Sequence, residues 1–255
     1  MTHAHASPSA GALRPLRGEL LITAWEKGSQ QSQPMRALAL LAEGCGLDER
    51  EAVALSIPER DAALLALRQC SFGNALHGFA TCLACAERLE FTLSADDIID
   101  RFDAAAQSAG STEYGPWSLH CRFATTAAIA AAVAEPDLAA ARQVLLARCV
   151  AATHTDGHSV PLTDLPQELL AAADERLVAM HEAAEVLVSL VCPGCEAAQD
   201  VALDLTEFLW AETRHAARRL LADVHELAWA YGWAENAILA MSAPRRAAYL
   251  ALVRA

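Results

Sequence analysis

The sequence has little positive charge. Of its 255 residues, one is lysine (Lys27) and 18 are arginine, against 32 Asp and Glu, and the formal net charge is −13. A protein that binds nucleic acid places many Lys and Arg side chains against the phosphates. The densest arginine clusters here are the pairs Arg218-Arg219 and Arg245-Arg246, for which we expect ion pairing on helix surfaces. The composition therefore argues against a nucleic-acid partner.

Long apolar runs are also missing. Residues 1–15 lack the apolar core of a secretion signal. The longest alanine-rich apolar stretch, residues 127–134, is far shorter than the ~20 residues of a membrane span. We therefore expect a cytoplasmic protein with no membrane partner and a flexible tail at residues 1–15. In a reducing compartment, the eight cysteines are expected to be thiols or metal ligands.

The common catalytic motifs are absent as well. There is no G-x-S-x-G, phosphate-binding glycine loop, H-E-x-x-H or dinucleotide fingerprint. His154, Asp156 and His158 gather within residues 153–161, but a polar surface loop explains them better than a metal or acid–base site. We predict that the protein is not an enzyme and has no small-molecule substrate.

Local signals predict helices in both terminal parts of the chain. Ser56 and Glu59 form a capping box that opens a helix ending at Gly73. Thr125 or Thr126 is expected to cap a further helix, and Pro136-Asp137 to begin another that reaches about Val150. The last third is predicted to contain a long helix from Thr206 to about Tyr231, ended by Gly232.

Segments in which apolar and polar residues alternate predict strands near the middle of the chain. They cover residues 88–93, 117–123, 186–191 and 201–205. A loop rich in Ala, Gly and Ser is expected between the first two, and a polar loop over residues 153–161.

Two close cysteine pairs carry the most specific chemical signal. Cys82-Leu-Ala-Cys85 and Cys192-Pro-Gly-Cys195 are each followed within a few residues by an alternating segment. A C-x-x-C turn places two sulfurs on one side of a metal, and two such turns complete a tetrahedral site for Zn²⁺. We therefore predict one structural zinc, bound by these four cysteines in a zinc-ribbon-like arrangement.

The two pairs are 106 residues apart, which is longer than the usual spacing. Lengthening the loop from ~18 to ~106 residues costs only about 1.6 kcal/mol, against roughly 10–16 kcal/mol for structural zinc. Three alternatives stay open: a redox dithiol at Cys192 and Cys195, four plain core thiols, and a first pair that has lost its metal. The other cysteines (Cys45, Cys70, Cys121 and Cys149) are predicted to be core residues.

The expected fold is α+β and mainly helical. Helical regions at residues 16–80 and 206–255 are expected to flank a small zinc-ribbon-like β unit at 81–205. This unit is built from the two C-x-x-C knuckles and carries an inserted α/β segment at about 100–183.

Three segments resemble a known family. They are GELLITAWEKG with RALALLA (residues 18–28 and 36–42), ERDAALLALR (59–68), and LLADVHELAWAYGWAE with RRAAYLALV (220–235 and 245–253). Together they are similar to the T4-type phage baseplate proteins, also described as baseplate hub assembly chaperones, whose relatives occur in phage-tail-like contractile injection systems. Knuckles in these relatives look like C-P-x-C-G, and this sequence departs from that pattern at Leu83, Ala86 and Glu196.

The resemblance implies a non-catalytic role in building a baseplate or its hub, with baseplate or hub proteins of a contractile tail as partners. Trp229, Tyr231 and Trp233 cluster in a chain that is only 5% aromatic. They are either a core anchor at a helix end or a partner-binding hot spot, because Trp and Tyr dominate such sites. The alternative interpretations are a zinc-ribbon regulator that binds nucleic acid, or a C-x-x-C thiol oxidoreductase.

Overall fold

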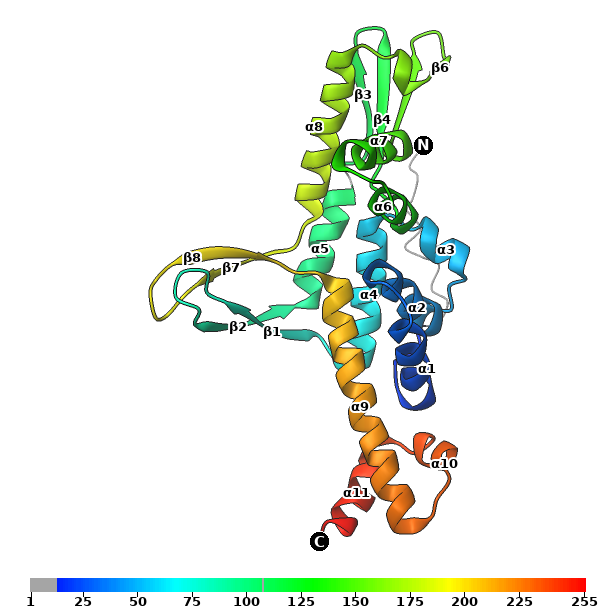
Figure 1. The fold of residues 1–255 in the computed structure, drawn as a ribbon, viewed down its shortest axis with the longest axis vertical. Coiled ribbons are helices and arrows are strands. Elements are labelled where there is room, and N and C mark those ends of the chain that lie inside the picture. Colours follow the sequence, from blue (N-terminus) through cyan, green and yellow to red (C-terminus); the bar gives the residue numbers. More distant parts are fainter. Residues whose placement is uncertain (1–12, 107) are drawn as a thin grey trace. The chain divides into compact units, whose positions relative to one another are not determined.

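A computed structural model describes residues 13–106 and 108–255 of the chain. The protein is mainly helical, with small antiparallel sheets (Figure 1). It divides into two compact units, one made of residues 13–49, 63–73 and 205–255, the other of residues 50–62 and 74–204. Most of the tail predicted at residues 1–15 lies outside the described residues.

The first unit is helical. Its elements are α1 (Gly18–Ser29), α2 (Gln33–Cys45), the later part of α4 (Ile57–Phe72), α9 (Leu205–Tyr231), α10 (Glu235–Leu239) and α11 (Ala243–Val253). α9 is the scaffold, because α1, α2, α10 and α11 all pack against it. Its buried residues recur every three or four positions from Leu205 to Leu227, which is the spacing of one helix face. The predicted end of this helix at Tyr231 is confirmed.

The second unit contains a four-stranded antiparallel sheet in the order β3-β4-β5-β6. Its strands are β3 (Gly110–Tyr114), β4 (Trp117–Cys121), β5 (Val150–His154) and β6 (Ser159–Val160), and its helices are α3 (Glu49–Ala54), α5 (Ala95–Ala106), α6 (Thr126–Val133), α7 (Leu138–Cys149), α8 (Gln167–Ala184) and the 3-10 turn η1 (Leu162–Asp164). α8 lies beside the sheet and contacts β4 (Figure 1). Buried Leu119, Cys121, Cys149 and Met180 belong to one core cluster here.

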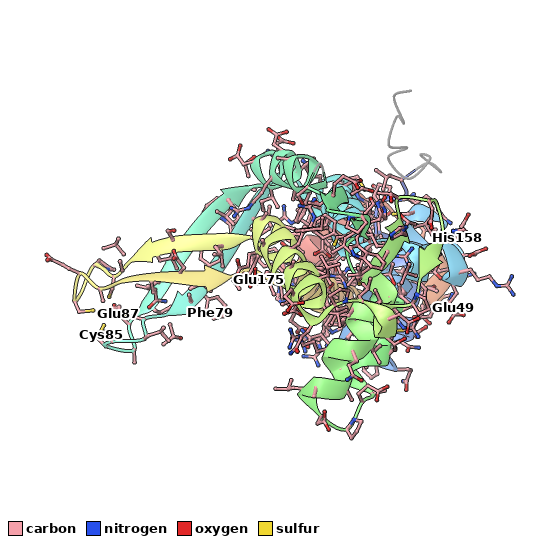
Figure 2. The ribbon with its side chains drawn as sticks, turned by 90° about the horizontal axis from the view of Figure 1, so that it is seen from above. Glu49, Phe79, Cys85, Glu87, His158 and Glu175 are labelled. Carbon is pink, nitrogen blue, oxygen red and sulfur yellow. The ribbon has the colours of Figure 1, made fainter. Side chains whose placement is uncertain are left out.

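Two further sheets in this unit are isolated hairpins. One pairs β1 (Ala75–Thr81) with β2 (Arg88–Ser94), and the other pairs β7 (Leu187–Val191) with β8 (Ala198–Ala202). Figure 2 shows the hairpins side by side, with their tips together. Because α5 and α8 contact each other and join directly to β2 and nearly directly to β7, the helical part of the unit holds the two hairpins next to each other.

Several local predictions are confirmed. The Ser56 N–H donates to Glu59 Oε2 at 2.9 Å, and the Glu59 N–H donates to Ser56 Oγ at 3.4 Å, which is the predicted capping box. Thr125 and Asp137 accept from backbone N–H groups at the starts of α6 and α7.

Other local predictions are wrong. The predicted loop after the first strand contains α5 and β3. In α5, buried Ile98 and Phe102 are four positions apart, a helical spacing that the many small residues around them obscured. The polar stretch at 153–161 contains the end of β5 and all of β6, because pairing with β4 gives β5 hydrogen-bond partners that its composition does not predict.

Candidate metal centre

Each C-x-x-C sequence forms the turn of a hairpin. In the first turn, the Cys82 N–H donates to the Glu87 carbonyl at 2.8 Å, and the Cys82 carbonyl accepts from the Ala86 N–H at 2.9 Å. The second turn, from Cys192 to Cys195, repeats both bonds at the same relative positions, at 3.0 and 2.9 Å. The turns therefore have the same local structure despite their different sequences.

The two turns bring four sulfur atoms together. Sγ of Cys82 lies 3.6 Å from Sγ of Cys195, and Sγ of Cys85 lies 3.5 Å from Sγ of Cys192. All four sulfurs lie within 4.8 Å of one another. Zn–S bonds of about 2.3 Å in a tetrahedron would separate the sulfurs by about 3.8 Å. The donor set therefore fits one tetrahedral ion that prefers thiolates.

The site has a buried side and an exposed side. Cys82 and Cys192 are 2% and 1% exposed and cluster with buried Leu89, whereas Cys85 and Cys195 are exposed. One cysteine of each pair thus belongs to the apolar cluster between the hairpins, and the other is exposed to solvent. Figure 2 labels the exposed Cys85 at the tip of its hairpin.

A glutamine joins the hairpins beside the cysteines. Gln199 on β8 accepts from the Leu83 N–H at 2.8 Å and donates to the Thr81 carbonyl at 3.1 Å. Its amide therefore fixes the first turn to the second hairpin through two backbone groups. The sequence alone does not single out Gln199, because an isolated glutamine in a strand carries no motif.

Backbone N–H groups favour the thiolate form at Cys82. Hydrogen bonds from the N–H groups of Cys85 and Ala84 lower the pKa of Cys82 to about 7, against the smaller effect of burial. A turn that stabilises a thiolate before metal arrives favours metal binding, because the ligand must lose its proton first.

The neighbouring thiols oppose further ionisation. The Glu87 N–H lowers the pKa of Cys85, but the thiols of Cys195 and Cys192 raise it by more, to about 12. At Cys195, the Ala197 N–H lowers the pKa, while the Cys82 thiol and burial contribute to a net increase. Without a cation, the cluster therefore keeps protons that a metal ion would displace.

Both turns place a residue other than glycine in the left-handed backbone region. Ala86 has φ +63° and Glu196 has φ +60°, and each directly follows the second cysteine of its pair. These are two of the positions at which the sequence departs from the C-P-x-C-G pattern, so the turn keeps its shape although a side chain is unfavourable there.

We expect Ala86→Gly and Glu196→Gly each to raise the free energy of unfolding, by about 0.5–1 kcal/mol, because glycine adopts this conformation without strain. Urea denaturation followed by circular dichroism measures the change. Ala84→Gly, in the same turn but without a positive φ, is the matched control and is expected to destabilise. A loss of stability in both test variants would contradict the argument.

The remaining cysteines lie elsewhere. Cys121 and Cys149 are buried in the core of the four-stranded sheet, as predicted, whereas Cys45 and Cys70 are only half-buried.

The strand β8, not a helix, follows Cys195, so the second pair lacks the helix N-terminus that lowers a thiol pKa in redox dithiols.

The two histidines of the polar loop flank the carboxylate of Asp156. Nδ1 of His154 and Nδ1 of His158 lie 3.2 and 3.1 Å from the two carboxylate oxygens of Asp156. Across residues 13–106 and 108–255, the four cysteines are the one group of three or more candidate ligands whose donor atoms all lie within 4.8 Å.

The aromatic cluster combines stacked rings with one strongly exposed ring. The rings of Tyr231 and Trp233 stack with centroids 4.5 Å apart, and the Tyr249 ring packs edge-on against Trp233 at 4.8 Å. Trp229 is 87% exposed on α9.

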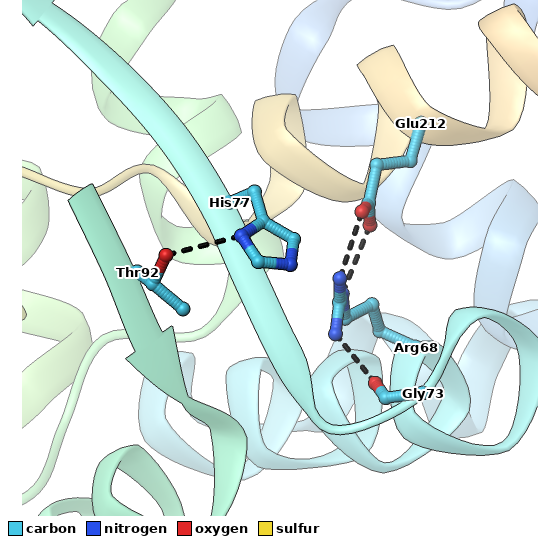
Figure 3. Close-up of polar contacts among 5 residues, drawn as sticks. All are labelled: Arg68, Gly73, His77, Thr92 and Glu212. Atoms are coloured by element: carbon cyan, nitrogen blue, oxygen red, sulfur yellow. Dashed lines mark hydrogen bonds and ion pairs between the residues drawn. The ribbon is translucent and has the colours of Figure 1, made fainter. Parts of the chain in front are cut away.

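The arginines pair differently from the prediction. Figure 3 shows Arg68 of α4, which is 3% exposed, bound to Glu212 of α9 and to the Gly73 carbonyl. Arg246 lies 4.0 Å from Asp223, but within the described part of the chain Arg218, Arg219 and Arg245 make no ion pair. The expectation of ion pairing is therefore wrong for these three residues. Arg218 has no Asp or Glu three or four positions away on α9, and Asp223, four positions after Arg219, lies beside Arg246 instead.

These features define a mainly helical protein with small antiparallel sheets and a candidate four-thiol metal centre. The model of a family described as T4 bacteriophage base plate protein matches residues 17–210. Because the match covers more than half of the chain, the protein belongs to the family of T4-type phage baseplate proteins. The matched residues include both cysteine pairs and end before the segment at 220–253.

No curated protein and no solved structure matches the chain. Within the described residues, no helix is long and apolar enough to cross a membrane.

Proposed function

We propose that this baseplate protein is a non-catalytic factor that helps to build the baseplate or its hub in a contractile phage tail or a contractile injection system. We further propose that one structural zinc, bound by Cys82, Cys85, Cys192 and Cys195 in a zinc-ribbon-like unit, stabilises its fold. Its partners are then other baseplate or hub proteins, and the cytoplasm is where it acts.

The observation that best supports a zinc site is the group of four thiols itself. Two hairpins from distant parts of the chain present four sulfurs at tetrahedral spacing, with backbone N–H groups directed at Cys82. Two-stranded hairpins are marginally stable in water, and their shared apolar cluster has three buried members, Cys82, Leu89 and Cys192. A metal ion would supply the cross-link that this small core lacks.

Metal content tests the site. Elemental mass spectrometry of the purified full chain is expected to find about one zinc per chain in the wild type and none in Cys192→Ser. Cys70→Ser, which replaces a half-buried thiol of the other unit, is the matched control and should keep the metal. Iron in place of zinc would keep the four-thiol site and change the cofactor. A folded wild type without metal would contradict the proposal.

A complementation experiment tests the assembly role. Deleting the gene from its phage or injection-system cluster is expected to abolish complete particles, and the wild-type gene should restore them. Mass spectrometry of purified particles then distinguishes a factor that leaves from a component that stays. Normal, functional particles in the deletion strain would contradict both a temporary assembly factor and a lasting component.

The exposed tryptophan is the proposed contact residue for a partner. We expect Trp229→Ala to change the free energy of unfolding by less than about 0.5 kcal/mol, since the ring is solvated, while lowering particle yield in the complementation assay. Trp233→Ala, which removes a packed ring, should cost about 2–4 kcal/mol. If Trp229→Ala assembled particles as well as the wild type, the hot-spot interpretation would be wrong.

The alternative functions receive less support. A zinc-ribbon regulator would need a basic face, but Arg88 is the one basic residue near the turns and stacks on the Phe79 ring at 4.3 Å. A thiol oxidoreductase would leave Cys82 and Cys85 without a role, although they lie within the same cluster.

A further inference from the structure

A broad groove runs through the helical unit. It has a volume of about 1660 Å³ and is lined by the segment before α1 and by parts of α1, α9, α10 and α11. Pockets for small molecules usually measure about 300–1,000 Å³. The size therefore points to a segment of a macromolecule as the occupant.

The charges of the groove are unbalanced. Arg14, Arg17 and Arg219 line it and make no side-chain hydrogen bond or ion pair with any other described residue, and all three are exposed. By contrast, three of the four acidic lining residues are neutralised, because Glu43 pairs with Lys27, Glu212 with Arg68 and Asp223 with Arg246. The fourth, Glu19, is exposed and makes no ion pair with another described residue, so three unpaired arginines face one unpaired carboxylate. In a chain whose formal charge is −13, the groove is thus a local excess of positive charge.

The position of Arg17 is unfavourable for the isolated fold. It is the N-cap residue of α1, and its side chain makes no capping bond. A cation at the positive end of a helix dipole is destabilising, whereas an anion bound there is stabilised. A residue whose position destabilises the local structure often has a functional role.

The segment that carries Arg14 and Arg17 is fixed. The Arg14 N–H donates to the Gly44 carbonyl at 2.7 Å, and the N–H of buried Leu16 donates to Ser71 Oγ at 2.9 Å. The backbone is therefore positioned before any ligand arrives, which lowers the entropic cost of binding.

Apolar side chains complete the groove. Leu20, Leu239 and Met241 line it and are partly exposed. Arginines beside partly exposed apolar side chains match an amphipathic helix with one acidic and one apolar face. The chain's own residues 1–12 contain no Asp or Glu, so charge argues against them as the occupant.

We propose that this groove binds an acidic amphipathic segment of a partner protein, with Arg14, Arg17 and Arg219 contacting its carboxylates. The inference rests on the proposed function only in taking the partner to be another protein of the assembly. The groove lies in the first unit, whereas the four cysteines of the candidate metal centre lie in the second, so the two proposals can fail separately.

The test measures binding of a fluorescein-labelled peptide of about 18 residues, with Leu at helical i, i+3, i+4 spacing and Glu elsewhere. Fluorescence anisotropy with the full-length chain should give saturable, salt-sensitive binding. Arg14→Gln/Arg17→Gln/Arg219→Gln is expected to weaken it roughly tenfold, since each exposed ionic contact contributes modestly.

Three controls make the result decisive. Arg50→Gln/Arg101→Gln/Arg148→Gln removes the same charge from the other unit and should bind like the wild type, as should Cys192→Ser. The same peptide with Lys in place of Glu should not bind. The proposal would be overturned if the peptide did not bind, or if both triple variants bound it equally. It would also be overturned if a DNA oligonucleotide bound equally tightly, or if the chain formed a dimer that the first triple variant dissociates.

Discussion

Replacing Glu212 with leucine is expected to lower the free energy of unfolding by about 3 kcal/mol. Nε and Nη2 of Arg68 donate to the two Glu212 carboxylate oxygens at 3.0 and 2.8 Å. Because the Arg68 side chain is only 3% exposed, the substitution would remove from a buried guanidinium the carboxylate that binds both its Nε and its Nη2. Urea denaturation of the purified chain measures the loss.

The same helix provides a matched control. Glu226 of α9 also binds an arginine in a two-point geometry, with Arg254 at 2.9 and 2.7 Å, but that arginine is 63% exposed. Glu226→Leu should therefore cost less than about 1 kcal/mol. The double variant Arg68→Leu/Glu212→Leu should recover most of the loss, since no charge is then left buried. Equal effects of Glu212→Leu and Glu226→Leu would contradict the role of burial.

Removing the metal from the proposed centre is expected to unfold the two hairpins while the rest of their unit stays folded. Amide exchange in β1, β2, β7 and β8 should accelerate roughly 100-fold or more after chelation, because little apolar contact is left to hold these strands. The four-stranded sheet has its own core around Leu119 and Cys121, so exchange in β4 should change little. Hydrogen-exchange mass spectrometry resolves the two regions, and uniform acceleration would contradict this prediction.

The metal affinity should also fall as the pH falls. The pKa of Cys85 is raised to about 12 and that of Cys195 is raised as well, so both thiols hold protons at neutral pH in the metal-free protein. Metal binding must displace these protons, and acidification therefore favours the free protein. Competition with a chromogenic chelator between about pH 8 and about pH 6 measures the trend. An affinity independent of pH would exclude thiolate ligation.

The features that could be predicted from sequence are those encoded locally. The capping box at Ser56 and the long helix ending at Tyr231 depend on residues a few positions apart. The grouping of the cysteines was also predictable, because each C-x-x-C turn is local and zinc chemistry supplies the reason for their meeting.

The missed features depend on pairing over long distances. β1 holds small residues such as Gly78 and Ala80, which face Phe91 and Leu89 of β2, so its alternation is weak until the partner strand is known. The contact of Gln199 with the first turn joins residues more than a hundred positions apart. The ionic partners of α9 likewise come from α2, from α4 and from α11 with the residue that follows it, and not from its own surface.

The spacing of the cysteine pairs has a consequence for synthesis on the ribosome. The 106 residues between Cys85 and Cys192 are translated after the first pair has been synthesised, which takes about 5–20 seconds at about 5–20 residues per second. During that interval Cys82 and Cys85 have no partner turn, and the segment that contains α5, the four-stranded sheet and α8 emerges between the two halves of the site. The order of translation therefore lets this inserted segment fold before the two hairpins can meet.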